Sequence, residues 1–130
     1  MSVKEFAERY ITAQNDAWKH GNFETLEKIE SPDIQVHTPP VAEHNGFKEH
    51  MQQIIKMRGI TKDFHQDWGY VTGDGTVAVL SLKETFTLTT DLPEFKVPAG
   101  TMVNLDAYFV LKTEDERVVE LWEKGSLTLK

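Results

Sequence analysis

The order of apolar positions predicts three helices in the first half of the chain. Ser2 followed by Glu5 is typical of a helix N-terminus, and apolar residues then recur at helical spacing until Gly21. Shorter apolar stripes predict a second helix between residues 22 and 31 and a third over residues 47–59. We therefore expect three amphipathic helices, each with one face against a common core.

A change of period separates these helices from a second half rich in strands. Apolar and polar residues alternate from Phe64 onward, and Gly73-Asp74-Gly75 supplies a turn typical of a hairpin. The predicted long strands span residues 64–71, 76–90, 101–113 and 117–128. A polar connection over residues 91–100 is long enough to cover the mouth of a pocket. Helices followed by strands predict an α+β fold, with the helices on one face of a curved sheet.

Composition narrows the class of protein. A chain of 130 residues suffices for one core, and we expect a single domain over residues 1–130. The formal net charge of −7 argues against nucleic acid and anionic membranes as partners. The absence of cysteine excludes disulfides and thiolate chemistry. Because neither a signal-peptide pattern nor an apolar run of about 20 residues occurs, we expect a cytoplasmic protein without a membrane span.

One segment carries a family resemblance. Trp18, Gly21, Asn22 and Leu26 form a W-x-x-G-(D/N)-x-x-x-L turn, Ser31-Pro32 is expected to end the second helix, and a predicted strand over residues 34–37 ends in His37-Thr38-Pro39. The segment resembles the opening of SnoaL-like proteins, which belong to the NTF2-like superfamily. The resemblance implies a cone in which three N-terminal helices pack on a strongly curved sheet, antiparallel or mixed, around an apolar cavity. It implies a pocket without fixing a reaction.

Three residues are candidates for acid–base chemistry through this resemblance: His37, Asp106 and Glu120. His37 occupies the place of the family's cavity histidine, and an imidazole can exchange a proton near neutral pH. Asp106 shares one face of its predicted strand with Asn104 and Tyr108, and family members carry a cavity aspartate on this penultimate strand. The alternative is that both residues have structural roles. His37 would then be an ordinary hydrogen-bonded strand residue, and Asp106 would belong to a solvent-facing sheet surface.

The last strand offers two carboxylates on opposite faces. Alternation groups Glu120 with Trp122 and Glu123 with Leu121, and a bulge at Gly125 would exchange the two faces. The resemblance to the family's Glu-x-Trp ending favours Glu120 as the cavity residue. Further candidates for substrate contact share an aromatic or amide side chain on a predicted apolar face. They are Tyr10, Gln14, Trp18, Trp68, Tyr108 and Trp122.

The combined expectation is a protein that binds a small apolar organic molecule. The family-implied reaction is proton abstraction beside a carbonyl, as in a cyclase or isomerase, without a cofactor. The alternatives are an epoxide hydrolase-like enzyme and a non-catalytic ligand-binding or dimerisation module. The histidine spacings match no common metal motif, so no metal site is predicted. Because the long strands carry apolar residues on both faces, a homodimer through the sheet is expected.

Overall fold

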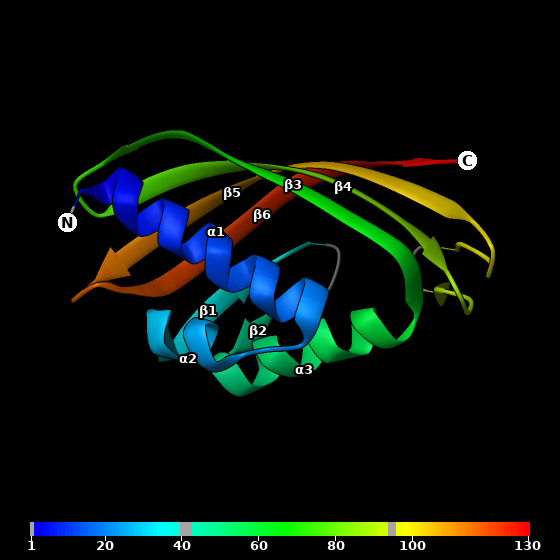
Figure 1. Ribbon diagram of the computed structural model, residues 1–130, viewed down its shortest axis with the longest axis horizontal. Helices are drawn as coiled ribbons and strands as arrows, with labels where there is room; N and C mark the ends of the chain where they lie inside the picture. Colours follow the sequence, from blue (N-terminus) through cyan, green and yellow to red (C-terminus); the bar gives the residue numbers. More distant parts are fainter. Residues whose placement is uncertain (1, 40–42, 94–95) are drawn as a thin grey trace.

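Helices come first and long strands follow in the computed structural model, which confirms the predicted α+β order (Figure 1). The structure describes residues 2–39, 43–93 and 96–130, so Pro40 and part of the predicted polar connection lie outside it. Its helices are α1 (Val3–His20), α2 (Glu24–Ile29) and α3 (Phe47–Gly59). Its strands are β1 (Glu30–His37), β2 (His44–Asn45), β3 (Thr61–Asp74), β4 (Val77–Leu88), β5 (Met102–Glu114) and β6 (Arg117–Leu129).

Both ends of α1 are set by the residues that the sequence singles out. The Ser2 hydroxyl accepts a hydrogen bond from the Glu5 N–H at 3.1 Å, which satisfies one of the free donors of the first turn. Gly21 ends the helix with φ of +67°, and its N–H donates to the Ala17 carbonyl. A Cβ at this position would lie 2.6 Å from a guanidinium nitrogen of Arg58. Glycine is therefore favoured here by the left-handed backbone, whereas the end of the flexible Arg58 side chain can move aside.

The passage from α2 to β1 differs from the prediction. Ser31-Pro32 does not separate a helix from a later strand, because β1 already begins at Glu30. Proline is tolerated here since the pairing of β1 with β6 is irregular between Glu30 and Gln35, where no regular ladder bond is lost. β1 thus starts four residues earlier than predicted. Its first residue, Glu30, lies on the side of the sheet that the helices cover.

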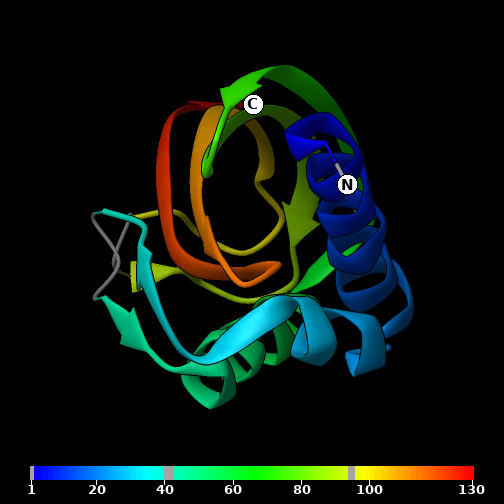
Figure 2. The same cartoon turned by 90° about the vertical axis from the view of Figure 1, so that its left-hand side faces the viewer.

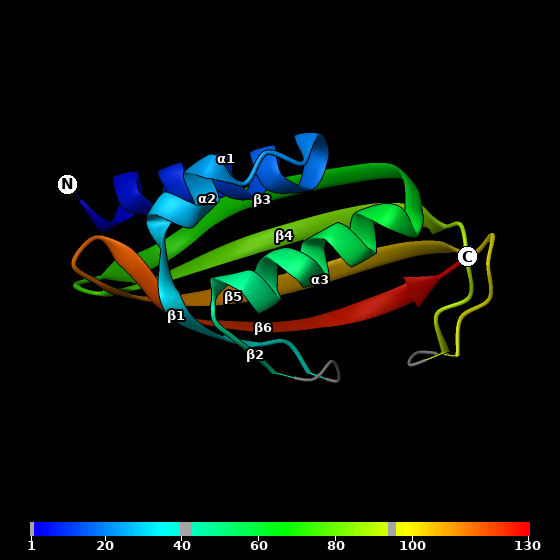
Figure 3. The same ribbon diagram turned by 90° about the horizontal axis from the view of Figure 1, so that it is seen from below.

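One mixed sheet forms the other half of the molecule. Its order is β2-β1-β6-β5-β4-β3, with β1 parallel to β6 and the other neighbours antiparallel. Seen from one end, the sheet curls strongly, and the helices close its open side (Figure 2). From below, α3 lies across the long strands beside α1 and α2 (Figure 3). The concave face therefore becomes the interior, and the convex face is left uncovered by helices.

Candidate functional site

A cavity of about 720 Å³ lies between the concave face of the sheet and the helices α1 and α3. Its walls are mostly apolar and aromatic. Trp18 stacks on Phe64 with ring centroids 5.4 Å apart, and Phe64 stacks on Phe86 at 6.0 Å. Leu92 and Val97, from the predicted polar connection, also line the cavity. The space can hold a small organic molecule that buries an apolar skeleton.

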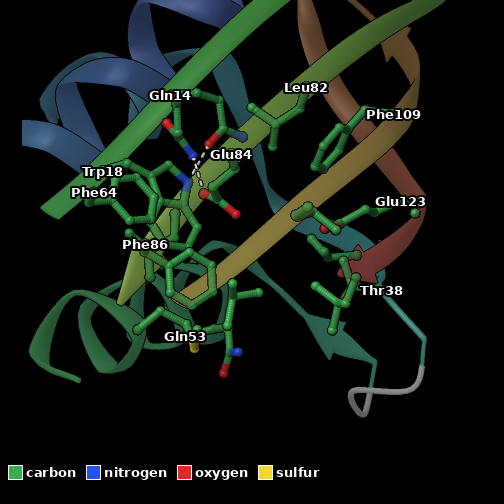
Figure 4. A pocket seen from close by; sticks show the side chains of 18 of the residues that line it. Gln14, Trp18, Thr38, Gln53, Phe64, Leu82, Glu84, Phe86, Phe109 and Glu123 are labelled. Atoms are coloured by element: carbon green, nitrogen blue, oxygen red, sulfur yellow. Dashed lines mark hydrogen bonds between the residues drawn. The ribbon is translucent and has the colours of Figure 1, made fainter. Parts of the chain in front are cut away.

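Glu84 is the first of two carboxyl groups in this apolar space (Figure 4). It interrupts the run of inward-facing leucines and phenylalanines on β4, and the residue is only 7% exposed. Gln66 Nε2 donates to Glu84 Oε1 at 2.9 Å, and Trp68 Nε1 donates to Gln66 Oε1 at 3.1 Å. Burial raises the pKa of Glu84 to about 7; the Gln66 bond opposes this rise and the negative charge of Glu123 adds to it.

Glu123 is the second carboxyl group, and it enters the cavity from β6. It pairs with the buried Phe109 of β5, which fixes its side chain on the concave face. Burial raises the pKa of Glu123 to about 7, while positive charge on His50 opposes the rise. Within the described part of the chain, no residue donates a hydrogen bond to this carboxyl group. Its oxygens are therefore free to bind a ligand.

A chain of hydrogen bonds runs beneath the cavity wall from α1 to α3. Trp18 Nε1 donates to Gln14 Oε1 at 3.0 Å, and Gln14 Nε2 donates to the Tyr10 hydroxyl at 2.8 Å. The Tyr10 hydroxyl donates to Glu30 Oε2 at 2.6 Å, and Glu30 Oε1 lies 2.8 Å from His50 Nδ1. Burial, followed by the charge of Glu30, raises the pKa of Tyr10 well above its ordinary value. The hydroxyl therefore stays protonated and acts as a donor.

His37 and Glu120 meet, but outside the cavity. His37 Nε2 lies 2.8 Å from Glu120 Oε2, and His37 Nδ1 lies 2.7 Å from Glu43 Oε1. The imidazole also stacks on Trp122 at 5.5 Å. Hydrogen bonds to Glu43 and then to Glu120 raise the pKa of His37. Both ring nitrogens are thus engaged on the convex face, and neither His37 nor Glu120 lines the cavity.

The predicted orientation of Asp106 and Glu120 toward the cavity is wrong. Asp106 is exposed on the convex side of β5, far along the strand from Glu120 in the register with β6. The pairing of β5 with β6 runs through Gly125 without a shift, so the residue forms no bulge and the alternation holds. Leu121 and Glu123 therefore face inward. The resemblance had favoured the opposite face of the last strand.

The residues predicted to contact the substrate also divide between the cavity and the convex face. Gln14, Trp18 and Trp68 line the cavity, whereas Tyr10 lies one hydrogen bond behind the wall. Tyr108 and Trp122 are on the convex face, with 60% and 38% of their surface exposed. Sequence reasoning missed Glu84 and His50. Both carry a detectable signal, because each occupies a position within an otherwise apolar stripe of its strand or helix.

Among the described residues, no three histidine, aspartate or glutamate side chains come together as ligands for a metal ion. No helix in the described ranges is long and apolar enough to cross a membrane.

A curled mixed sheet whose concave face is closed by three helices defines the NTF2-like fold, which solved structures with this architecture share with the chain. TsrD from Streptomyces laurentii covers 97% of this chain and 92% of its own, at 15% identity and a TM-score of 0.81. IdmH from Streptomyces antibioticus, a candidate polyketide cyclase, covers 94% and 92%, at 16% identity and a TM-score of 0.73.

An epoxide hydrolase from M. tuberculosis covers 94% of this chain and 84% of its own, at 14% identity and a TM-score of 0.70. At such identities the likeness concerns the fold. Within this fold, the chain belongs to the SnoaL-like domain family, whose sequence model matches residues 8–121. A search among curated proteins finds no match. The family and the fold expected from the sequence are thereby confirmed.

Proposed function

We propose that this protein is an enzyme that binds a small, largely apolar carbonyl compound and transfers a proton on it without a cofactor. The observation that carries the proposal is the presence of two carboxyl groups, Glu84 and Glu123, in one apolar cavity, where burial raises the pKa of each to about 7. A protein that only sequesters an apolar ligand gains nothing from two acids in an apolar cavity. An acid–base enzyme needs groups whose pKa values lie near the working pH.

The chemistry follows from the two protonation states that coexist near neutral pH. A protonated carboxyl group can donate to the carbonyl oxygen of the substrate, and an ionised one can accept the proton from the neighbouring carbon. The apolar walls strengthen both interactions because they keep the local dielectric low. Isomerisation or ring closure then depends on which carbon of the enol reacts. The candidate polyketide cyclase among the structural neighbours is consistent with this class of reaction.

Hydration of an epoxide is the second candidate function. The same two carboxyl groups favour it, because an ionised carboxylate can activate water while a protonated one donates to the epoxide oxygen. The epoxide hydrolase from M. tuberculosis shares the fold. A non-catalytic binding module is the third candidate function. Such a module would not depend on a pKa near neutrality in either carboxyl group.

The test uses exchange of the protons next to a carbonyl. The probe is 2-tetralone in D2O, with loss of the α-proton signal followed by ¹H NMR, and styrene oxide is assayed in parallel for diol formation. We expect wild-type exchange above the buffer rate and a loss of about 100-fold or more in Glu123→Gln. Glu27→Gln is the matched control on the exposed side of α2. Diol formation without exchange would favour the epoxide reaction, and inactivity in both assays would favour a binding module.

We also propose that two copies of the chain associate through the convex face of the sheet. Tyr108 and Trp122 are large side chains exposed there, and neither lines the cavity. Burial of such a patch against a second copy removes apolar surface from water. Light scattering coupled to size-exclusion chromatography should report twice the monomer mass. Trp122→Arg should reduce that mass to the monomer value, and a monomeric wild-type protein at micromolar concentration would overturn the proposal.

A further inference from the structure

His50 and Glu30 form a buried pair at the edge of the cavity that the carboxyl chemistry above does not use. Their side chains are 8% and 0% exposed, and His50 Nδ1 lies 2.8 Å from Glu30 Oε1. The fold brings them together at the start of α3. The Gly46 N–H donates to the Ile34 carbonyl at 2.6 Å, and the His50 N–H donates to the Gly46 carbonyl at 3.2 Å. The first turn of α3 is thereby fixed on β1, one end of which carries Glu30.

The direction of each hydrogen bond fixes where the imidazole proton lies. The Tyr10 hydroxyl already accepts from Gln14 Nε2, so its own proton points to Glu30 Oε2. With Glu30 ionised, its other oxygen can only accept, which requires the proton on His50 Nδ1. A neutral imidazole protonated at Nδ1 has its lone pair on Nε2. Among the described residues, none is hydrogen-bonded to Nε2, while His50 itself lines the cavity.

We propose that His50 is a catalytic residue that accepts the substrate proton through Nε2, and that Glu30 is the positioning residue that fixes its tautomer and balances its charge. This inference rests on the proposed function and gives the role of base to His50 in place of an ionised carboxyl group. The substrate C–H bond breaks, an Nε2–H bond forms, and the electron pair moves into the enol double bond. The carbonyl oxygen takes a proton from the carboxyl group of Glu123. The imidazolium later returns its proton to a carbon atom, and Glu123 recovers its own.

The charges of His50 and Glu123 interact in the direction that the proposed proton transfer requires. Positive charge on His50 lowers the pKa of Glu123, so protonation of the imidazole favours release of the Glu123 proton to the substrate oxygen. The titratable groups that interact with His50 include Glu30, Glu123 and His44 on β2. Burial and the charge of His50 lower the pKa of His44, which leaves that second imidazole neutral. Glu30 is thus the carboxyl group in direct contact with the imidazole, at 2.8 Å from Nδ1.

The first test reads the tautomer directly in the ligand-free protein. ¹⁵N-labelled histidine gives separate NMR signals for protonated and unprotonated ring nitrogens, and His50→Gln assigns the signals of His50. We expect the Nδ1–H form in the wild type. In Glu30→Gln, Tyr10 still donates to the side-chain oxygen, so the new amide group donates to Nδ1 and moves the ring proton to Nε2. An Nε2–H form in the wild type, or an unchanged tautomer in Glu30→Gln, would overturn the positioning role.

The second test measures 2-tetralone exchange in the same variants. His50→Gln and Glu30→Gln should each lower kcat/KM by about 100-fold or more, since the first removes the base and the second places a proton on it. The matched control is His65→Gln, whose exposed ring lies on the other face of β3 from Phe64 and Gln66. Should Glu30→Gln not fold, His50→Gln and the wild-type tautomer decide.

The outcomes separate this inference from the proposed function. Exchange by the wild type together with a wild-type rate in His50→Gln would overturn the role of His50 and leave the carboxyl chemistry standing. Absence of exchange in the wild type would overturn both. Loss of exchange in His50→Gln and Glu30→Gln, with the expected tautomer change and with His65→Gln active, would establish the pair.

Discussion

Replacing Glu84 with glutamine should make the protein more stable in alkaline solution. In the folded protein, burial raises the pKa of Glu84 from 4.5 to about 7. The unfolded chain therefore releases this proton at lower pH than the folded chain does. Between these two values the folded state binds more protons, so stability falls as pH rises through this window and levels off above it.

The magnitude follows from the two pKa values. They differ by about 2.5, and each pKa unit corresponds to about 1.4 kcal/mol, so ionisation of Glu84 costs the folded state about 3 kcal/mol. Glutamine has nearly the same shape and keeps an oxygen that accepts the 2.9 Å bond from Gln66. Glu84→Gln removes the ionisation and little else. Its advantage over the wild type should grow by about 3 kcal/mol between about pH 4.5 and about pH 8.5.

Urea unfolding followed by tryptophan fluorescence measures this difference without adding salt. Each protein is unfolded at both pH values, and the change in the free-energy difference is compared. Glu27→Gln, on the exposed surface of α2, serves as the control and should show no such change. A change below about 1 kcal/mol in Glu84→Gln would refute the reasoning, because it would place the pKa of Glu84 close to its ordinary value.

Three further outcomes are expected. Asp106→Asn should leave 2-tetralone exchange unchanged, because this side chain is exposed on the convex face. Leu82→Trp should fill part of the cavity and weaken binding of a fluorescent apolar probe such as anilinonaphthalene sulfonate, without loss of the folded circular dichroism spectrum. Gly125→Ala should lower the free energy of unfolding in urea by about 1–3 kcal/mol, since the added Cβ would lie 2.8 Å from the Asp106 carbonyl oxygen.

The fold could be predicted because its signals are local. Ser2 and Gly21 mark the ends of α1 through caps that depend on a few neighbouring residues, and the structure forms both. The alternation of the second half is a property of single strands and identifies β3 to β6. The start of β1 was missed because Ser31-Pro32 normally interrupts regular structure. Here the irregular pairing with β6 accommodates it.

The site was harder to predict because each strand has two faces with similar composition. On the last strand, Glu120 shares its face with Trp122 and Glu123 shares the other face with Leu121, so hydrophobicity does not distinguish the cavity side. Only the pairing with β5 decides it, by placing Glu123 opposite Phe109. Glu30 has no sequence signal at all, because its two partners, Tyr10 and His50, come from other elements.

The three inward glutamates differ in how completely their oxygens are satisfied, and this difference argues for catalysis. Glu30 accepts from Tyr10 and His50, and Glu84 accepts from Gln66. Glu123 accepts from none of the described residues. A carboxyl group that lines an apolar cavity without donors destabilises a fold, and it persists where function requires it. The two groups with free oxygens face the cavity, whereas the satisfied one lies behind the imidazole. This difference in hydrogen bonding is expected of a site in which one carboxylate positions a base and the others exchange protons with a substrate.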